Sequence, residues 1–418
     1  MTDTTLTHSA TAPEMKPENP VTTFASFGLP PSLNDTLRNM GYSAPTPIQL
    51  EAIPPALEGK DILGSAQTGT GKTAAYAIPL IAKLLSNPRG SALILTPTRE
   101  LATQVMSVLK KMLGNRSQIA TALLIGGESM GPQFAQLRNR PRLVIGTPGR
   151  INDHLDRGSL MLNEASFLVL DETDRMLDMG FSVQLDKIAK FLPKVRQTLM
   201  FSATFPHNIL KLSEKYLTTP VRIKIGESTA PAANIKHEVM HTSDANKYEL
   251  LLKELGARQG SIIVFVKTKR GADRLAIRLN KQQLSADAIH GDLKQSKRDR
   301  VIAGFREKKH RILVATDVAA RGLDIPHIEH VINFDMPHAP EDYIHRIGRT
   351  ARAGAQGAAL SLVSPEDSGR WRDIQRLMNP GSVPPRPERS SSKPFNKKRK
   401  PFHARRPGGK PQSQPRAA

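Results

Sequence analysis

The sequence predicts an α/β protein in which two tandem domains are each built on a parallel β-sheet. The chain has 418 residues, which is too long for one ordinary domain. Short aliphatic runs recur along it, and each is followed by a turn and a helix-like segment. This alternation is typical of strands buried in a parallel sheet. Because it occurs twice, on either side of a break, we expect two domains of the same architecture.

The predicted strands fall into two groups. In the first half they are residues 61–65, 92–96, 121–125, 143–146, 167–170 and 198–201. In the second half they are residues 261–266, 286–290, 311–316, 330–334 and 358–363. Between the groups, residues 226–233 are small, flexible and proline-containing, which predicts a linker. The expected domains are therefore residues 21–225 and 234–380.

Both ends of the chain have compositions that cannot bury a core. Residues 1–20 are polar and contain proline, whereas residues 381–418 hold eleven basic side chains, one acidic side chain and eight prolines. We expect both segments to be disordered. The tail carries +10 of the net charge of +22. Such an excess attracts polyanions, usually nucleic acid, although a merely soluble basic protein or one drawn to anionic lipid is the alternative.

Composition also limits the class of protein and its location. The chain has no cysteine, which excludes a disulfide framework and any cysteine-ligated metal site. The twelve histidines show no metal-ligand spacing, so no structural zinc is expected. The first twenty residues do not resemble a signal peptide. The best apolar stretch, residues 74–82, is too short to span a bilayer. We expect a soluble, cytoplasmic protein that does not bind membranes.

A phosphate-binding loop follows the first predicted strand and opens a helix. Its glycines let backbone N–H groups approach phosphates, and the helix N-terminus adds partial positive charge. Lys72 can reach the β- and γ-phosphates of ATP, and the Thr73 hydroxyl can bind Mg²⁺. The general pattern begins with glycine, whereas this loop begins with Ala66. The predicted phosphate-binding residues are Ala66, Gln67, Thr68, Gly69, Thr70, Gly71, Lys72 and Thr73.

Two acids stand at the C-terminal end of the predicted strand 167–170. Ligands bind at that end of the strands in open α/β sheets. Asp171 would bind Mg²⁺, and Glu172 would position or deprotonate the attacking water. Acids at a strand end are also common as solvated loop residues. The P-loop upstream favours the catalytic interpretation.

The segment that holds these acids, Asp171-Glu-Thr-Asp174, resembles the signature of the DEAD-box helicases. Thr173 stands where alanine is usual in that family. Further along, Ser202-Ala-Thr204 resembles the family motif that couples ATP hydrolysis to strand separation, which makes Ser202 and Thr204 candidate catalytic residues. The resemblance implies two RecA-like domains that share one ATP site and one RNA groove.

Residues 41–49 resemble the family's adenine-reading Q motif. The resemblance makes Gln49 and the upstream aromatic Phe24 candidate nucleotide-binding residues. An amide side chain both donates and accepts, so Gln49 can match an adenine edge. Taken alone, the same segment would be explained as a proline-rich turn before a helix.

The second half has no P-loop, but it contains two further family-like motifs. Residues 345–354 resemble motif VI, in which Arg349 and Arg352 would be the arginine fingers. Guanidinium groups suit this role because they are planar, always charged and able to bridge phosphate oxygens. Residues 315–324 resemble motif V, in which Gly322 and Asp324 would contact the nucleotide.

Short polar and cationic residues in the remaining family-like motifs are candidates for RNA contacts. They suit phosphate and 2′-OH groups, and contacts of that kind imply little sequence specificity. The candidates are Pro97, Thr98, Arg99, Gly126, Gly127, Thr147, Arg150, Thr268, Arg298 and Thr316.

Motifs in family order across residues 24–354 thus imply an ATP-dependent RNA helicase that uses ATP and Mg²⁺. The alternatives are a P-loop ATPase that acts on DNA and a non-enzymatic RNA chaperone with a decayed ATP site. Intact Lys72, Asp171 and Glu172 argue against the chaperone. The resemblance also suggests a bacterial enzyme of ribosome assembly, RNA decay or cold adaptation, and the sequence does not choose among these.

Overall fold

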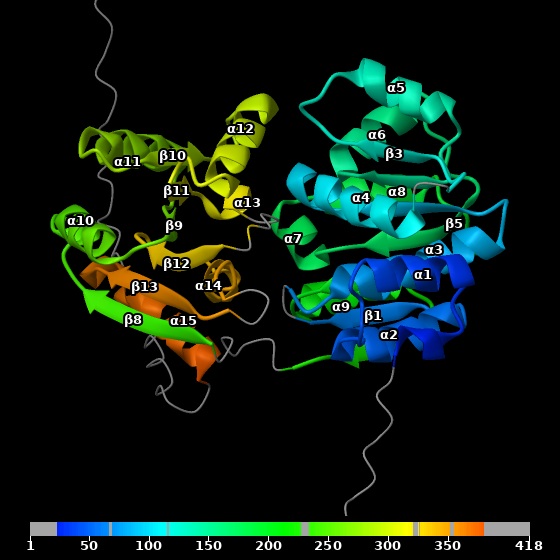
Figure 1. The fold of residues 1–418 in the computed structure, drawn as a ribbon, viewed down its shortest axis with the longest axis horizontal. Helices are drawn as coiled ribbons and strands as arrows, with labels where there is room; N and C mark the ends of the chain where they lie inside the picture. The colour runs from blue at the N-terminus through cyan, green and yellow to red at the C-terminus, as the bar shows by residue number, and fades with distance from the viewer. Residues whose placement is uncertain are drawn as a thin grey trace, which may run out of the picture.

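The computed structural model describes residues 23–66, 69–114, 117–226, 234–320, 325, 327–351 and 355–379. Two α/β bodies lie side by side (Figure 1). The predicted disordered segments 1–20 and 381–418, and nearly all of the predicted linker 226–233, lie outside the described residues. These segments and the exact domain boundaries stay predictions.

The first domain is built on a parallel sheet of seven strands, in the order β3-β4-β2-β5-β6-β1-β7. The strands are β1 (Ile62–Ser65), β2 (Ser91–Leu95), β3 (Thr121–Leu124), β4 (Leu143–Gly146), β5 (Ala165–Leu170), β6 (Gln197–Ser202) and β7 (Val221–Lys224). The helices are η1 (Phe24–Phe27), α1 (Pro31–Asn39), α2 (Pro47–Leu57), α3 (Lys72–Ser86), α4 (Arg99–Leu113), α5 (Met130–Arg138), α6 (Pro148–Asp156), α7 (Thr173–Asp178), α8 (Ser182–Ala189) and α9 (His207–Tyr216).

The second domain repeats this plan with a parallel sheet of six strands, in the order β10-β11-β9-β12-β13-β8. The strands are β8 (Ile235–His241), β9 (Ser261–Phe265), β10 (Ala286–Ile289), β11 (Ile312–Ala315), β12 (Ile328–Asn333) and β13 (Gly357–Val363). The helices are α10 (Lys247–Ala257), α11 (Lys269–Lys281), α12 (Gln295–Arg306), α13 (Asp317–Ala320), α14 (Pro340–Ile347), η3 (Pro365–Asp367) and α15 (Ser368–Met378). The predicted fold class is therefore confirmed.

Each sheet is covered on both faces, because alternate residues of a strand enter different hydrophobic cores. In β5, Phe167 and Val169 pack into one core, whereas Leu168 and Leu170 pack into the other. The strands of the second domain divide their side chains in the same way between two cores. Strands buried on both faces need apolar residues at every position, which explains the continuous aliphatic runs in the sequence.

The two strands that the sequence analysis missed, β7 and β8, both lie at sheet edges. In β7 only Ile223 is buried, and in β8 only Ile235 is. An edge strand with one solvated side carries polar residues between its apolar ones. The criterion of a continuous aliphatic run therefore could not detect these two strands.

The order of the strands determines which motifs meet. In the first sheet β6 lies between β5 and β1, and all three strands are parallel. The P-loop follows β1, the two predicted acids follow β5, and Ser202 is the last residue of β6. The three motifs are thus brought together at the carboxyl ends of these strands, where open α/β folds bind ligands. Among the described residues, no helix has the length and apolar character needed to cross a bilayer.

Candidate active site and nucleic-acid groove

The P-loop turns sharply between β1 and α3. Gly71 has a φ of 96° and stands just before Lys72, the first residue of α3. A β-carbon at Gly71 would collide with the amide of Gln49, so only glycine fits this left-handed position. The ammonium of Lys72 donates to the carbonyl oxygen of Ala66 at 2.8 Å. Lys72 is therefore folded back across the mouth of its own loop. Gln67 and Thr68 lie outside the described residues.

Asp171 is a buried carboxylate held by a residue of α3. The Tyr76 hydroxyl donates to its Oδ2 at 2.8 Å, and Tyr76 is itself fully buried. The Thr73 side chain lies beside the same hydroxyl, so the two predicted metal ligands meet at Tyr76. Burial raises the pKa of the Asp171 carboxyl to about 6, and the charge of Glu172 adds to the rise, whereas Lys72 and the Tyr76 hydrogen bond oppose it.

Glu172 is buried and has a left-handed backbone, with a φ of 51°. Its carboxylate forms an ion pair with the guanidinium of Arg175 at 2.9 Å. Arg175 is 2% exposed, so this pair is removed from solvent screening. A non-glycine residue in this conformation directly before α7 indicates a backbone that is held by its surroundings.

The segment Ser202 to Thr204 is hydrogen-bonded to the end of β1 and to the start of α7. The Ala203 N–H donates to Oδ2 of Asp174 at 2.9 Å, and the Ala203 carbonyl accepts from the Ser65 hydroxyl at 2.9 Å. Ser202 is fully buried, and among the described residues its hydroxyl has no hydrogen-bond partner. Thr204 is partly exposed. The end of β1, the Ser202–Thr204 segment and the Asp171–Asp174 segment are therefore joined by hydrogen bonds.

Gln49 of the Q motif contacts the P-loop directly. Oε1 of Gln49 accepts from the Thr46 N–H at 2.9 Å, and its Nε2 donates to the carbonyl of Gly71 at 3.1 Å. One amide hydrogen and one lone pair of Gln49 are left for a base. Phe24 is buried and packs edge-on against Phe27 and Tyr42.

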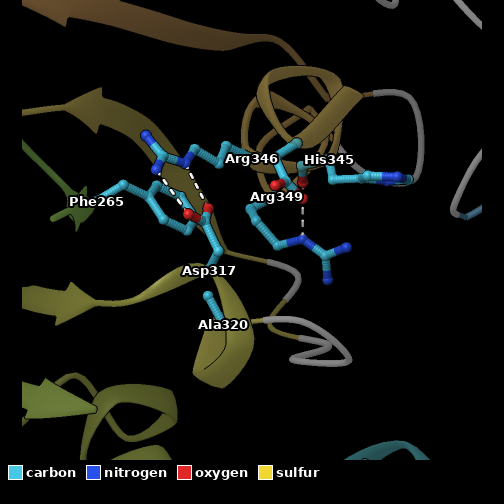
Figure 2. A pocket seen from close by; sticks show the side chains of 7 residues that line it. Phe265, Asp317, Ala320, His345, Arg346 and Arg349 are labelled. Carbon is cyan, nitrogen blue, oxygen red and sulfur yellow. Dashed lines mark hydrogen bonds and ion pairs between the residues drawn. The ribbon is translucent and has the colours of Figure 1, made fainter. Parts of the chain in front are cut away.

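Arg349 of the second domain lines a small pocket together with residues of α13 and α14 (Figure 2). Its Nε donates to the carbonyl of His345 at 3.1 Å. Beside it, the buried guanidinium of Arg346 pairs with both carboxylate oxygens of Asp317, at 2.5 and 2.8 Å, and lies over the ring of Phe265. Arg346 thus anchors α14, and Arg349 lies in the turn just after this helix ends. Arg352, Gly322 and Asp324 lie outside the described residues.

A groove of about 410 Å³ is lined by residues of both domains. Seven of the ten predicted RNA-contacting residues line it: Pro97, Thr98, Arg99, Gly126, Thr147, Arg150 and Arg298. The other three do not line it: Gly127, Thr268 and Thr316. Gly127 has a φ of 78°, and a β-carbon there would collide with the guanidinium of Arg99. Thr268 caps α11 by accepting from the Gly271 N–H, and Thr316 is buried.

The two domains touch across this groove. Arg298 donates from Nε to Oε1 of Glu100 at 2.7 Å, and both side chains are about nine-tenths buried. Arg99 donates to the side chain of Gln295 at 3.0 Å. Burial lowers the pKa of Arg99, while Glu100 raises it and Arg298 lowers it further. Two of the predicted RNA-contacting arginines, Arg99 and Arg298, are therefore each hydrogen-bonded to a side chain of the opposite domain.

Two family models match the chain. A DEAD/DEAH box helicase model matches residues 46–212, and a helicase conserved C-terminal domain model matches residues 246–354. Similar curated proteins include two bacterial DEAD-box ATP-dependent RNA helicases named CshA. The Geobacillus kaustophilus protein is 44% identical over 360 residues, which span 85% of this chain and 76% of that protein. The Bacillus subtilis protein is 41% identical over 356 residues, which span 85% and 72%.

The chain belongs to the DEAD-box helicase family.

Solved structures of DEAD-box proteins share its fold. Saccharomyces cerevisiae Dbp5 bound to RNA and ADP BeF3 is 32% identical, with a TM-score of 0.77 and coverage of 85% of this chain and 93% of that chain. Mss116p bound to ssRNA and AMP-PNP is 29% identical, with a TM-score of 0.76 and coverage of 85% and 76%. The prediction of two tandem RecA-like domains is therefore confirmed.

Several residues of this DEAD-box protein were missed by the sequence analysis, although they hold the predicted site residues in place. They are Tyr76, Glu100, Arg175, Gln295 and Arg346. Gln295 and Arg346 lie inside recognised motifs, so motif membership was their only sequence signal. In the sequence, Tyr76 looks like one more apolar residue of a buried helix. Nothing near it indicates that its hydroxyl binds Asp171, far along the chain.

Proposed function

We propose that this chain is an ATP-dependent RNA helicase in which ATP bound to the first domain is hydrolysed when RNA occupies the groove between the domains. One observation carries the proposal. The P-loop, the DETD acids and the Ser202 motif meet at the carboxyl ends of the first domain's strands, and the groove is lined by loops and helix starts that follow strands of both domains. Nucleotide and RNA would therefore bind to connected loops.

In this proposal Lys72 leaves the carbonyl of Ala66 and binds the β- and γ-phosphates of ATP. The Thr73 hydroxyl and the Asp171 carboxylate would hold Mg²⁺. They fit the ion because both are hard oxygen ligands and because both contact the Tyr76 hydroxyl, which places them together. The bound ion would neutralise charge on the phosphates.

Glu172 is proposed to orient the attacking water and accept its proton. Its carboxylate is held by an ion pair with the guanidinium of Arg175 at 2.9 Å. Since the pair is buried, Arg175 restricts where the carboxylate can point.

The second domain is proposed to complete the site with Arg349, and with Arg352 beyond it in the same motif. Arg346 and Asp317 hold α14 through a bidentate pair, and Arg349 lies in the turn directly after this anchored helix (Figure 2). A guanidinium that reaches the phosphates only after domain closure would make hydrolysis depend on RNA.

RNA is proposed to bind through its backbone, with Arg99 and Arg298 as the main cations of the groove. Both relatives of known structure described above were solved with RNA bound. We place the protein in the cytoplasm, where it would act in ribosome assembly, RNA decay or cold adaptation.

Phosphate release from ATP tests the proposal when it is measured without polymer, with RNA and with DNA of the same sequence. Release should be slow alone and strongly stimulated by RNA only. Equal stimulation by DNA would indicate a DNA-dependent ATPase, and no release in any condition would indicate a non-enzymatic RNA chaperone.

A further inference from the structure

The one departure from the DEAD signature, Thr173, forms contacts that the usual alanine could not. Thr173 is fully buried at the start of α7. Its hydroxyl lies 3.2 Å from the carbonyl oxygen of Leu170 and 3.1 Å from that of Phe201. A hydroxyl has one hydrogen, so the two carbonyls share it. The second contact joins the DETD segment to the strand that carries Ser202.

This contact begins where the strand pairing ends. The ladder between β5 and β6 runs from Phe167 opposite Gln197 to Leu170 opposite Met200 and stops there. Beyond it, the Thr173 hydroxyl reaches the Phe201 carbonyl, and Asp174 accepts from the Ala203 N–H. Hydrogen bonds from side chains therefore continue to join the two segments beyond the point where backbone pairing between β5 and β6 ends. With alanine at position 173, Asp174 alone would join them there.

The same short segment is also held from its other side. The Ser65 hydroxyl at the end of β1 donates to the Ala203 carbonyl at 2.9 Å. Residues 201–203 are thus bound to the P-loop strand on one side and to the DETD segment on the other. Between these points the buried Ser202 hydroxyl has no partner among the described residues. Buried hydroxyls are seldom left unpaired, which suggests that Ser202 acquires a partner in another state.

We propose that Thr173 is a positioning residue that transmits movement of the DETD segment to Ser202 and Thr204, and so reduces the number of ATP molecules hydrolysed per RNA duplex separated. The inference rests on the proposed helicase function and on the coupling role that the family resemblance implies for Ser202 and Thr204. Thr173 touches neither ATP nor RNA in this scheme. It acts by holding the Phe201 carbonyl against α7.

The test compares Thr173→Val, which keeps the shape and removes the hydroxyl, with Thr173→Ser, which keeps the hydroxyl. Thr198→Val is the matched control. Thr198 lies on the same strand β6 and is 1% exposed, and its hydroxyl has no partner among the described residues. Both valine variants therefore remove a buried hydroxyl from the same region, but only one removes a hydrogen bond.

Two quantities are measured in the full chain. The first is hydrogen exchange of the peptide spanning residues 197–204 without nucleotide. It should become faster in Thr173→Val by a factor on the order of threefold to tenfold, the worth of about one hydrogen bond. The second is the number of ATP molecules hydrolysed per short RNA duplex separated, which should rise several-fold. Thr173→Ser and Thr198→Val should match the unaltered protein in both.

The inference would be overturned if Thr173→Val changed neither the hydrogen exchange of residues 197–204 nor the number of ATP molecules hydrolysed per duplex separated. If Thr173→Val does not fold, Thr173→Ala replaces it, and equal behaviour of the serine and alanine variants would be the contrary result. Ser202→Ala separates this inference from the coupling role on which it rests. If Ser202→Ala raises the ATP cost and Thr173→Val does not, only the role of Thr173 is wrong. If neither raises it, the proposed coupling role itself is wrong.

Discussion

Arg298 of the second domain donates a hydrogen bond to Glu100 of the first, with 2.7 Å between Nε and Oε1. The pair closes one side of the groove proposed to bind RNA. RNA phosphates would have to replace the Glu100 carboxylate at this guanidinium. In the proposed function, binding of RNA and the relative position of the domains would thus be linked through Arg298.

Arg298→Ala should weaken RNA binding to a similar degree for RNAs of different sequence, because a backbone contact carries no sequence information. The slope of log affinity against log salt should flatten by about 0.7, the value for one neutralised phosphate on a single strand. Fluorescence anisotropy with two unrelated RNAs at several salt concentrations measures both. Arg300→Ala is the control, since Arg300 is an exposed cation on the same helix. Identical slopes of log affinity against log salt for the two variants would mean that Arg298 binds Glu100 and does not contact an RNA phosphate.

Asp171→Asn should stabilise the nucleotide-free protein while abolishing hydrolysis. The folded state raises the pKa of Asp171 from 3.8 to about 6. Its native form therefore binds a proton more tightly than its unfolded form, and stability is lost as pH rises through about 6. Above that pH the ionised group costs on the order of 2–3 kcal/mol. Asparagine removes this cost and still accepts the Tyr76 hydrogen bond.

The melting temperature should consequently rise by a few degrees at pH 8 and by less at pH 5. Asp35→Asn, at an exposed position, controls for the loss of a charge. A gain at pH 5 as large as that at pH 8 would contradict the raised pKa.

Gln49→Ala should lower the preference for ATP over GTP, because a site built to hydrogen-bond a base discriminates through the polar atoms left unpaired by the wrong base. It should also reduce stability by about 1 kcal/mol, since Gln49 completes the capping box of α2 with Thr46. Competition binding with both nucleotides and thermal melting separate the two effects. Lower stability with an unchanged ATP:GTP ratio would leave Gln49 with a capping role only.

Deletion of residues 381–418 should raise the RNA concentration needed for half-maximal ATP hydrolysis without changing the maximal rate. The segment holds eleven basic residues, and a tethered cationic chain raises the local concentration of RNA. If it engages about five phosphates, the salt dependence should flatten by about 3 units. Half-saturation measured at two salt concentrations decides this. Equal values for both proteins would exclude tethering, and a collapsed maximal rate would place the tail in the catalytic core.

The sequence was sufficient where local pattern determines structure. Strands covered on both faces must be continuously apolar, so β5 and its neighbours could be located. The P-loop needs glycine at Gly71 for its left-handed turn. Edge strands β7 and β8 have one solvated side and were missed.

Pairs formed by tertiary packing could not be predicted from local pattern. Tyr76 and Asp171 are 95 positions apart, and Glu100 and Arg298 are 198 positions apart. Nothing in the sequence near one member identifies the other. The same holds for Thr173, whose hydroxyl reaches the Phe201 carbonyl only because β6 lies beside β5.

The most direct test of the proposed function is ATP-driven separation of a short RNA duplex by the unaltered chain and by Glu172→Gln. The unaltered protein should release the strand in the presence of ATP and Mg²⁺. The glutamine variant should bind ATP and RNA about as well but hydrolyse ATP slower by orders of magnitude, because an amide cannot accept the proton. Near-normal hydrolysis by Glu172→Gln, or a duplex left intact by the unaltered protein at saturating ATP, would contradict the account.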